Sequence, residues 1–187
     1  MSNNKKISTY QLAITALFSA IMCILGPLSI PIGPIPVSFT NFAVMLAVYV
    51  LGTKLGTISL CVYILLGAVG LPVFSGATGG IGKLLGPTGG FIIGFIPFAI
   101  IAGIWFTKFA GNDIKGKIIQ GVGMFMGTVV LYGFGVVWFM ISLSATFEKA
   151  MTACVLPFII PDIIKIIVAI ILGNAIKVRL IKAGFAK

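Results

Sequence analysis

Charged residues are scarce in this sequence of 187 residues: they make up 9% of the chain, whereas hydrophobic residues make up 59%. A soluble domain usually carries about 25% charged residues. So few charges cannot cover a surface exposed to water, and the mean hydropathy of +1.22 agrees with this. The composition excludes an ordinary soluble domain and indicates an integral membrane protein.

Residues that serve in catalysis or metal binding are rarer still. The chain has no histidine, its three acidic residues lie far apart in the sequence, and its three cysteines are isolated in or beside apolar runs. The sequence therefore predicts neither an acid–base pair, nor an activated cysteine, nor a zinc site, nor a disulfide set. We expect no catalytic residue, no metal and no cofactor. The net charge of +10 does not indicate nucleic-acid binding, because the basic residues lie in small groups between apolar runs.

Long apolar runs dominate what is present. Six of them follow one another, at residues 12–30, 39–51, 57–71, 91–106, 118–143 and 154–176. A membrane-spanning helix needs about 20 apolar residues, and continuous runs are not the alternating pattern of a β-barrel. The run at 118–143 is long for one crossing and too short for two, so we expect one tilted or extended helix there. The sequence predicts an all-α membrane protein, with a single six-helix domain over residues 1–187.

The distribution of positive charge predicts the orientation of this domain. With six crossings, ten lysine and arginine residues fall on the side of the termini and two on the other side, while Lys165 lies inside a span. An excess of positive charge marks the cytoplasmic side, so both termini are predicted to be cytoplasmic. No small-residue cleavage site follows the basic start "MSNNKKISTY", so we expect the first helix to be retained.

Three irregular connections are then predicted on the outer side: the proline-rich link "PIGPIP", the glycine-rich stretch at 71–90, and the loop around Glu148. Irregular backbone at membrane depth is tolerated where it lines a cavity, so we expect a binding site at this face. The stretch "GATGGIGKLLGPTGG" resembles a phosphate loop, but Ala77 replaces its first glycine and Leu84 replaces the magnesium-binding hydroxyl. We instead expect the glycines to allow close approach to a small molecule, with a merely flexible loop as the alternative.

The stretch "FIIPDIIKII" carries a carboxylate and an ammonium inside an apolar run. Pro161 suits the first turn of a helix, which would place Asp162 at the positive end of the helix dipole and Lys165 on the same face. A charge inside the bilayer is costly and usually faces a cavity or a partner. We expect this pair to contact a ligand, with a mutual ion pair that anchors the helix end as the alternative.

The first apolar run carries a small-xxx-small pattern at Ala16 and Ala20. Small residues let helices approach closely in lipid. A face for a partner protein and internal packing are both consistent with this pattern.

Three motifs together resemble a known family. The segments "GPIPVSFTNFAVMLAVYVLG", "GLPVFSGATGGIGKLLGPTGGFIIGF" and "PFIIPDIIKII" are similar, in this order, to the signatures of the BioY family of biotin-specific substrate-binding (S) components of energy-coupling factor transporters. The resemblance implies a six-helix protein of a prokaryotic plasma membrane that binds biotin under its first, third and fifth loops. It also implies partners: a transmembrane coupling subunit, docked on the face of Ala16 and Ala20, and two ABC-type ATPases.

The resemblance also implies a ligand site. Asp162 would accept from the N–H groups of the ureido ring, and Lys165 or Asn41 would donate to its carbonyl. Aromatic walls and a carboxylate clamp would come from the residues of the first two motifs: Phe39, Phe74 and Phe91 as walls, Lys83 with Gly76, Gly82, Gly86, Thr88 and Gly89 around the carboxylate.

Two positions depart from the family pattern, since Asn41 stands where a glutamine is expected and Phe91 where a tyrosine is expected. A shorter amide can still bond the ligand, but Phe91 offers no hydroxyl. Two other interpretations stay open: a stand-alone proton-driven carrier that uses Asp162 as its proton site, and an S component for another vitamin.

Overall fold

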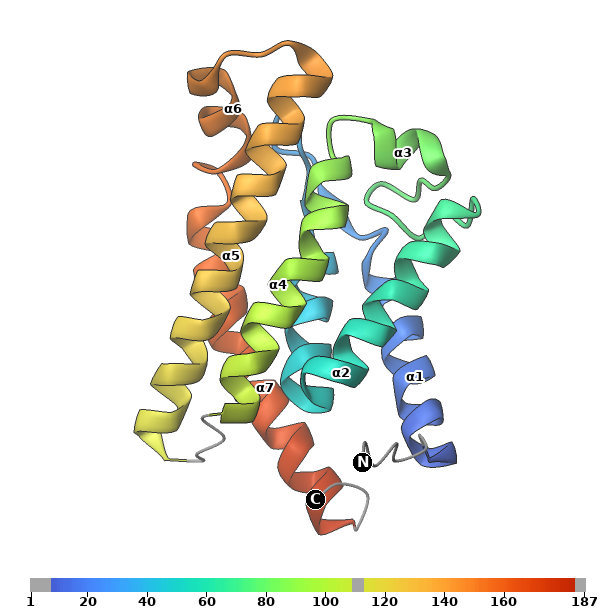
Figure 1. Ribbon diagram of the computed structural model, residues 1–187, viewed down its shortest axis with the longest axis vertical. Helices are drawn as coiled ribbons and strands as arrows, with labels where there is room; N and C mark the ends of the chain where they lie inside the picture. The colour runs from blue at the N-terminus through green and yellow to red at the C-terminus, as the bar shows by residue number, and fades with distance from the viewer. Residues whose placement is uncertain (1–7, 109–112, 184–187) are drawn as a thin grey trace, which may run out of the picture.

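The computed structural model describes residues 8–108 and 113–183. The described chain is mostly helical, with one short hairpin (Figure 1). In chain order the elements are α1 (Thr9–Leu25), β1 (Ser29–Ile30), β2 (Val37–Ser38), α2 (Thr40–Ala68), α3 (Ile81–Leu85), α4 (Gly89–Lys108), α5 (Ile114–Leu143), α6 (Phe147–Cys154) and α7 (Ile159–Lys182).

Helix α2 contains a sharp reversal at Gly52. Its backbone angles there, φ 76° and ψ −176°, belong to a region that is essentially restricted to glycine. The two halves pack closely, because a Cβ added at Gly56 would lie 2.9 Å from Cα of Val48. Figure 1 shows the helix folding back on itself at this point. The apolar runs predicted at 39–51 and 57–71 are therefore the two arms of α2.

Four helices among the described residues are long and apolar enough to cross a membrane: α2, α4, α5 and α7. Helix α1 is apolar but has 17 residues, about 26 Å of helix, which is near the lower limit for a span. The prediction of a mostly helical membrane protein is confirmed, and the run at 118–143 is indeed one helix. The count of six crossings and the cytoplasmic termini stay predictions.

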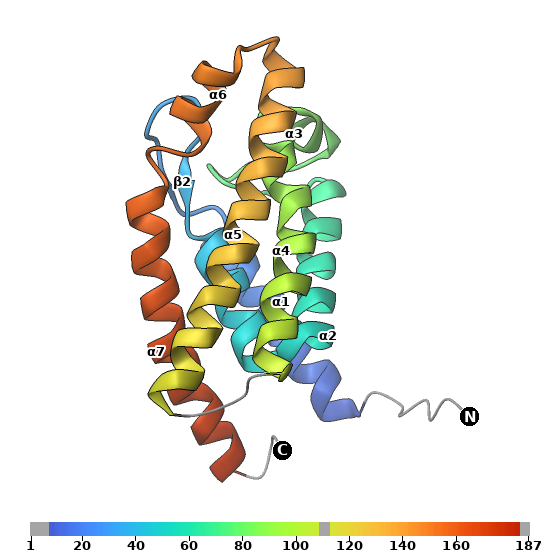
Figure 2. The same cartoon turned by 60° about the vertical axis from the view of Figure 1, so that its left-hand side comes forward.

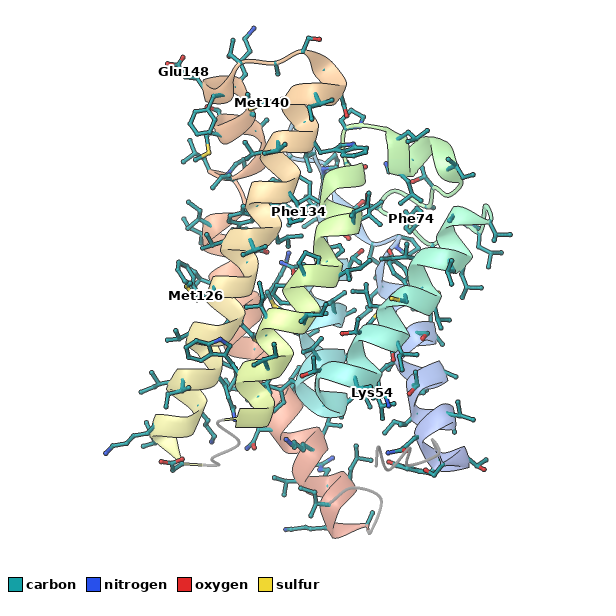
Figure 3. The ribbon with its side chains drawn as sticks, viewed as in Figure 1. Lys54, Phe74, Met126, Phe134, Met140 and Glu148 are labelled. Carbon is teal, nitrogen blue, oxygen red and sulfur yellow. The ribbon has the colours of Figure 1, made fainter. Side chains whose placement is uncertain are left out.

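Different elements lie at the two ends of the bundle. Helix α1 begins and α7 ends at one end, while α3 and α6 lie at the other (Figures 1 and 2). Figure 3 shows Lys54 near the first end and Glu148 at the second. The predicted outer connections around residues 71–90 and Glu148 therefore lie together, at the end opposite the Gly52 reversal.

The proline-rich link forms the antiparallel hairpin β1–β2, in which Ser29 pairs with Ser38 and Ile30 with Val37. The sequence predicts an irregular connection here, and the structure adds the strand pairing. Val37 packs in a second hydrophobic cluster with Val136 of α5 and Phe158 before α7. The β2 side of the hairpin is thereby packed against the helices, whereas Ile30 and Ile32 remain exposed.

The sixth apolar run differs from its prediction. Residues 154–176 were expected to form one continuous span, but α6 ends at Cys154 and α7 begins at Ile159. The four residues between them turn the chain, with the N–H of Phe158 donating to the carbonyl of Val155. Hydropathy did not mark this break, because the turn residues are as apolar as the helix that follows.

Candidate ligand pocket

A small pocket lies inside the bundle, between the start of α2, the first half of α4, the middle of α5, the start of α7 and the β2 strand. The centres of water molecules could occupy about 60 Å³ of it, which is room for several waters. The residues that line it are Ile35, Pro36, Ser38, Thr40, Asn41, Tyr63, Ser75, Thr88, Phe91, Ile92, Phe95, Leu131, Tyr132, Phe158, Asp162 and Lys165.

The Asp162–Lys165 ion pair forms one wall of this pocket. Nζ of Lys165 lies 3.1 Å from Oδ1 of Asp162, and Asp162 is 3% exposed. Asp162 occupies the first turn of α7, as predicted, where the helix dipole favours a negative charge. The same ammonium donates to the backbone carbonyl of Ser38 at 3.0 Å. The cation therefore ties α7 to the hairpin as well as to its own carboxylate.

Tyr132 of α5 holds the other oxygen of this carboxylate. Its hydroxyl donates to Oδ2 of Asp162 at 2.8 Å. Tyr132 belongs to none of the sequence motifs. Its one signal in the sequence is a hydroxyl group inside the uncharged run at 118–143. Each carboxylate oxygen has a second lone pair, so Asp162 can still accept from a ligand.

Two oxygen atoms of the lining lack a hydrogen-bond partner among the described residues: Oδ1 of Asn41 and Oγ1 of Thr88. Both are buried, and a buried polar group without a partner costs about 1–3 kcal/mol. Such groups in a native fold call for a specific explanation. A bound molecule with hydrogen-bonding groups of its own would satisfy both oxygens.

A chain of hydroxyl groups continues the polar side of the pocket. Oγ of Ser38 lies 2.6 Å from Oγ1 of Thr40, which lies 3.5 Å from the hydroxyl of Tyr63. That hydroxyl donates to the carbonyl of Val73 at 3.1 Å. Because these groups bond one another, they fix the hairpin against α2. Sequence reasoning missed all three, since single hydroxyl residues in apolar runs carry little signal.

Aromatic rings supply the apolar side. Phe91 of α4 and Phe158 are stacked with ring centroids 6.1 Å apart and an interplanar angle of 29°. Phe91 is a wall residue as predicted, whereas the role of Phe158, the first residue of the stretch "FIIPDIIKII", was not predicted. Phe95, one turn after Phe91, is 7% exposed and completes this side. The pocket thus pairs a flat apolar wall with a buried polar one.

Five of the twelve predicted ligand residues line the pocket, and seven lie elsewhere. Those in the lining are Asp162, Lys165, Asn41, Thr88 and Phe91. Those outside it are Lys83, Phe74, Phe39, Gly76, Gly82, Gly86 and Gly89.

Three of the seven residues outside the pocket have other surroundings in the structure: Phe74, Gly86 and Phe39. Phe74 is 1% exposed and packs edge-on against Tyr63, with ring centroids 5.6 Å apart. The carbonyl of Gly86 accepts from Nε1 of Trp138 at 3.0 Å. Phe39 is 41% exposed. The glycine-rich stretch contributes Ser75 and Thr88 to the lining and otherwise packs as a folded cap, with Phe74 bridged to Thr78.

The predicted partner face on α1 is open. Ala16 and Ala20 are exposed, as is Leu17, which is 57% exposed between them. The buried side of α1 carries Thr15 and Ser19 instead, and Ser19 donates to the carbonyl of Ser59 on α2. The two alanines are therefore not part of the contact between α1 and α2.

Apolar helices around a buried ion pair, two unpartnered oxygens and a pair of stacked rings define a membrane-embedded protein with a polar site inside its helix bundle. The family of this protein follows from its sequence. The model of the BioY family matches residues 1–182, and the chain belongs to the BioY family.

Its relatives are similar along nearly their whole length. A probable biotin transporter BioY of Pyrococcus horikoshii is 40% identical, over 89% of this chain and 96% of the relative. A biotin transporter BioY of Rhizobium etli is 37% identical, over 92% of this chain and 95% of the relative. The crystal structure of the S-component for biotin from an ECF-type ABC transporter superimposes with a TM-score of 0.81 and 30% identity, over 95% of this chain and 94% of that one.

These relatives are transport proteins and not enzymes. The chain is accordingly a multi-pass protein of a prokaryotic plasma membrane, with the S-component fold. The resemblance drawn from the three motifs is confirmed.

Proposed function

We propose that this chain binds biotin in the pocket between α2, α4, α5 and α7, as the substrate-binding subunit of an ATP-driven uptake system. The observation that carries the proposal is the juxtaposition of the Asp162–Lys165 pair with the unpartnered oxygens of Asn41 and Thr88 in the lining of one pocket. The similarity to proteins named as biotin transporters supports the choice of ligand.

The ureido group of biotin has two N–H donors and one carbonyl acceptor. Asp162 and Oδ1 of Asn41 are acceptors that face the same space, so they match the two donors. The Lys165 ammonium and the Thr88 hydroxyl can donate to the carbonyl. The fused rings would lie against Phe91 and share its stacking with Phe158.

The valerate carboxylate would point toward the glycine-rich cap. Lys83 on α3 is the cation nearest in sequence to the lining residue Thr88, and it remains our proposed clamp although it does not line the pocket. A ligand longer than the present cavity requires the cap to move outward, which would let Lys83 and the glycine N–H groups reach the carboxylate. A substantial minority of complexes show loop rearrangements on binding.

Titration calorimetry with biotin and biotin methyl ester tests both parts of this proposal. Wild-type protein is expected to bind biotin, and to bind the ester more weakly because the ester lacks the charge. Asp162→Asn is expected to weaken both ligands equally, since it changes the ureido end. Equal affinity for acid and ester in wild type would rule out Lys83 as the clamp. If titration with biotin released or absorbed no heat, biotin would not be the ligand.

We further propose that the exposed face of Ala16 and Ala20 docks on a transmembrane coupling subunit that works with two ABC-type ATPases. The support is the absence of contact between these alanines and α2, together with the exposure of Leu17 beside them. Small residues allow a partner helix to approach closely. Uptake that requires the co-expressed coupling subunit and its ATPases would support this arrangement.

A proton-driven carrier is the second candidate, because Asp162 is a carboxylate at membrane depth. Proton uptake by Asp162 would have to break its ion pair with Lys165, which argues against it. Uptake by the chain alone, abolished by a protonophore, would favour the carrier. A thermal-shift panel of vitamins would separate biotin from other ligands of the same transporter class.

A further inference from the structure

The turn at residues 86–89 joins α3 to α4 at the cap end of the bundle (Figure 1). It carries Thr88, whose hydroxyl oxygen is one of the two unpartnered oxygens of the pocket lining. The carbonyl of Thr88 accepts from the N–H groups of Phe91 at 3.2 Å and Ile92 at 3.4 Å, so Thr88 stands directly at the start of α4. A threonine at a helix start usually accepts from a first-turn N–H with its side chain. Here the hydroxyl makes no such bond and is left for the pocket.

Trp138, near the end of α5, contacts this turn from the neighbouring helix. Its Nε1 donates to the carbonyl of Gly86 at 3.0 Å, and the N–H of Gly89 donates to the same carbonyl at 2.9 Å. Both lone pairs of this carbonyl are therefore used. The backbone bond closes the turn, and the indole bond ties the closed turn to α5.

Two glycines allow Trp138 to lie this close to the backbone. A Cβ added at Gly90 would collide with the Trp138 side chain, and a Cβ added at Gly89 would lie 3.1 Å from its Nε1. The pair Gly89–Gly90 therefore packs directly against Trp138. The pocket residues Thr88 and Phe91 flank this pair in the sequence, so the indole lies behind the segment that carries both of them.

We propose that Trp138 is a positioning residue for ligand binding, which holds the Thr88 hydroxyl toward the pocket through the carbonyl of Gly86. The proposal rests on the biotin site proposed above. Trp138 does not line the pocket, so it acts through the turn and not on the ligand. A turn tied to α5 keeps the hydroxyl in place before a ligand arrives, and groups ordered in advance lower the cost of binding.

Hydrogen exchange of the purified full chain tests the contact without any ligand. Trp138→Phe keeps a ring beside Gly90 but removes the N–H that donates to Gly86. We expect amide exchange in residues 86–90 to become about fivefold faster, because one hydrogen bond that holds this turn is lost. Trp105→Phe is the matched control, since Trp105 of α4 packs against Gly123 of α5 away from the pocket. Exchange at 86–90 in this control should equal that of wild type.

Biotin affinity in a double-variant cycle tests whether Trp138 acts through Thr88. Thr88→Val and Trp138→Phe should each weaken biotin binding about fivefold, the effect of one lost hydrogen bond. The combined variant should also lose about fivefold, and not about 25-fold, because Trp138 has no hydroxyl left to position once Thr88 is valine. Trp105→Phe should leave biotin affinity unchanged in both the wild-type and the Thr88→Val chain.

Unchanged exchange at residues 86–90 in Trp138→Phe would overturn the proposal whether or not biotin binds. Independent, multiplying losses of affinity in the combined variant would also overturn it, since Trp138 would then support the fold in general. An equal loss of affinity in Trp105→Phe would lead to the same conclusion. Wild-type protein that binds no biotin would instead refute the proposed ligand, and the exchange measurement would still decide whether Trp138 holds the turn.

Discussion

Tyr132 on α5 donates a hydrogen bond of 2.8 Å to Asp162 on α7, and so positions a carboxylate that already faces Lys165 within its own helix. The contact joins two helices that both line an apolar groove. It leaves the carboxylate oriented by two donors before any ligand arrives. Pre-oriented acceptors of this kind lower the cost of ordering a binding site.

Removing this hydroxyl should weaken ligand binding. Tyr132→Phe keeps the ring but leaves one oxygen of Asp162 without its donor, and hydrogen bonds to charged groups contribute about 1.5–3 kcal/mol. We expect biotin affinity, measured by calorimetry, to fall roughly tenfold to hundredfold. Tyr49→Phe is the matched control, because it deletes the 2.9 Å bond to Gln120 away from the pocket. Affinity that falls equally in both variants would point to a general loss of packing.

The ion pair can be tested for its two possible roles with a double variant. Asp162→Asn and Lys165→Met should each reduce stability, because each leaves a buried charge without its partner. The combined variant should recover thermal stability but not biotin affinity, since both ligand contacts are gone. Affinity restored in the double variant would show that the residues hold each other and do not contact the ligand.

The shape of the aromatic wall depends on a glycine. A Cβ at Gly135 of α5 would collide with the ring of Phe91. Gly135→Ala should therefore push this ring into the pocket and lower biotin affinity about tenfold, with a smaller effect on the melting temperature. At Gly121, on the same helix, a Cβ would meet a flexible Ile170 carbon at 3.4 Å. Gly121→Ala should consequently bind biotin like wild type, and a matching loss there would refute the role of the Phe91 contact.

The reversal within α2 should be sensitive to any side chain at residue 52. Gly52 has a backbone conformation that costs other residues about 1–3 kcal/mol. Gly52→Ala is expected to lower the melting temperature in detergent, whereas Gly133→Ala, at an exposed position without neighbouring atoms, should not. Equal melting of both variants and wild type would mean that the chain does not need this reversal.

The predicted orientation can be measured by cysteine labelling of intact cells. In a background without native cysteines, Glu148→Cys should react with an impermeant maleimide, and Lys54→Cys should react after the cells are opened. The opposite pattern would place the termini outside.

Native Cys154 of the wild-type chain allows a separate labelling test of how closed this end of the protein is. It is buried, and burial raises the pKa of its thiol to about 11. The reactive thiolate is therefore scarce at pH 7 to 8, about one molecule in a thousand or fewer. Labelling of Cys154 in the wild-type chain should stay low and rise as the pH approaches 11. Rapid labelling of Cys154 at pH 7 would show that this end of the protein opens.

Hydropathy and charge in the sequence were sufficient for the membrane class and the helical runs, and Pro161 was sufficient to place Asp162 in a first turn. These features depend on local composition, since a bilayer demands long apolar helices whatever their packing. The Gly52 reversal was expected as a turn between two runs. The break between Cys154 and Ile159 was not expected, because apolar turns carry no hydropathy signal.

The ligand pocket shows the limit of sequence information. The motifs supplied Asp162, Lys165, Asn41, Thr88 and Phe91, which carry charge, amide or position within a recognisable pattern. Only the tertiary structure shows that Tyr132 bonds to Asp162 and that Phe158 stacks on Phe91. It also shows that Phe74 lies in the core and not in the pocket lining. Those placements depend on which helix faces meet, and a single hydroxyl or ring in an apolar run does not encode that.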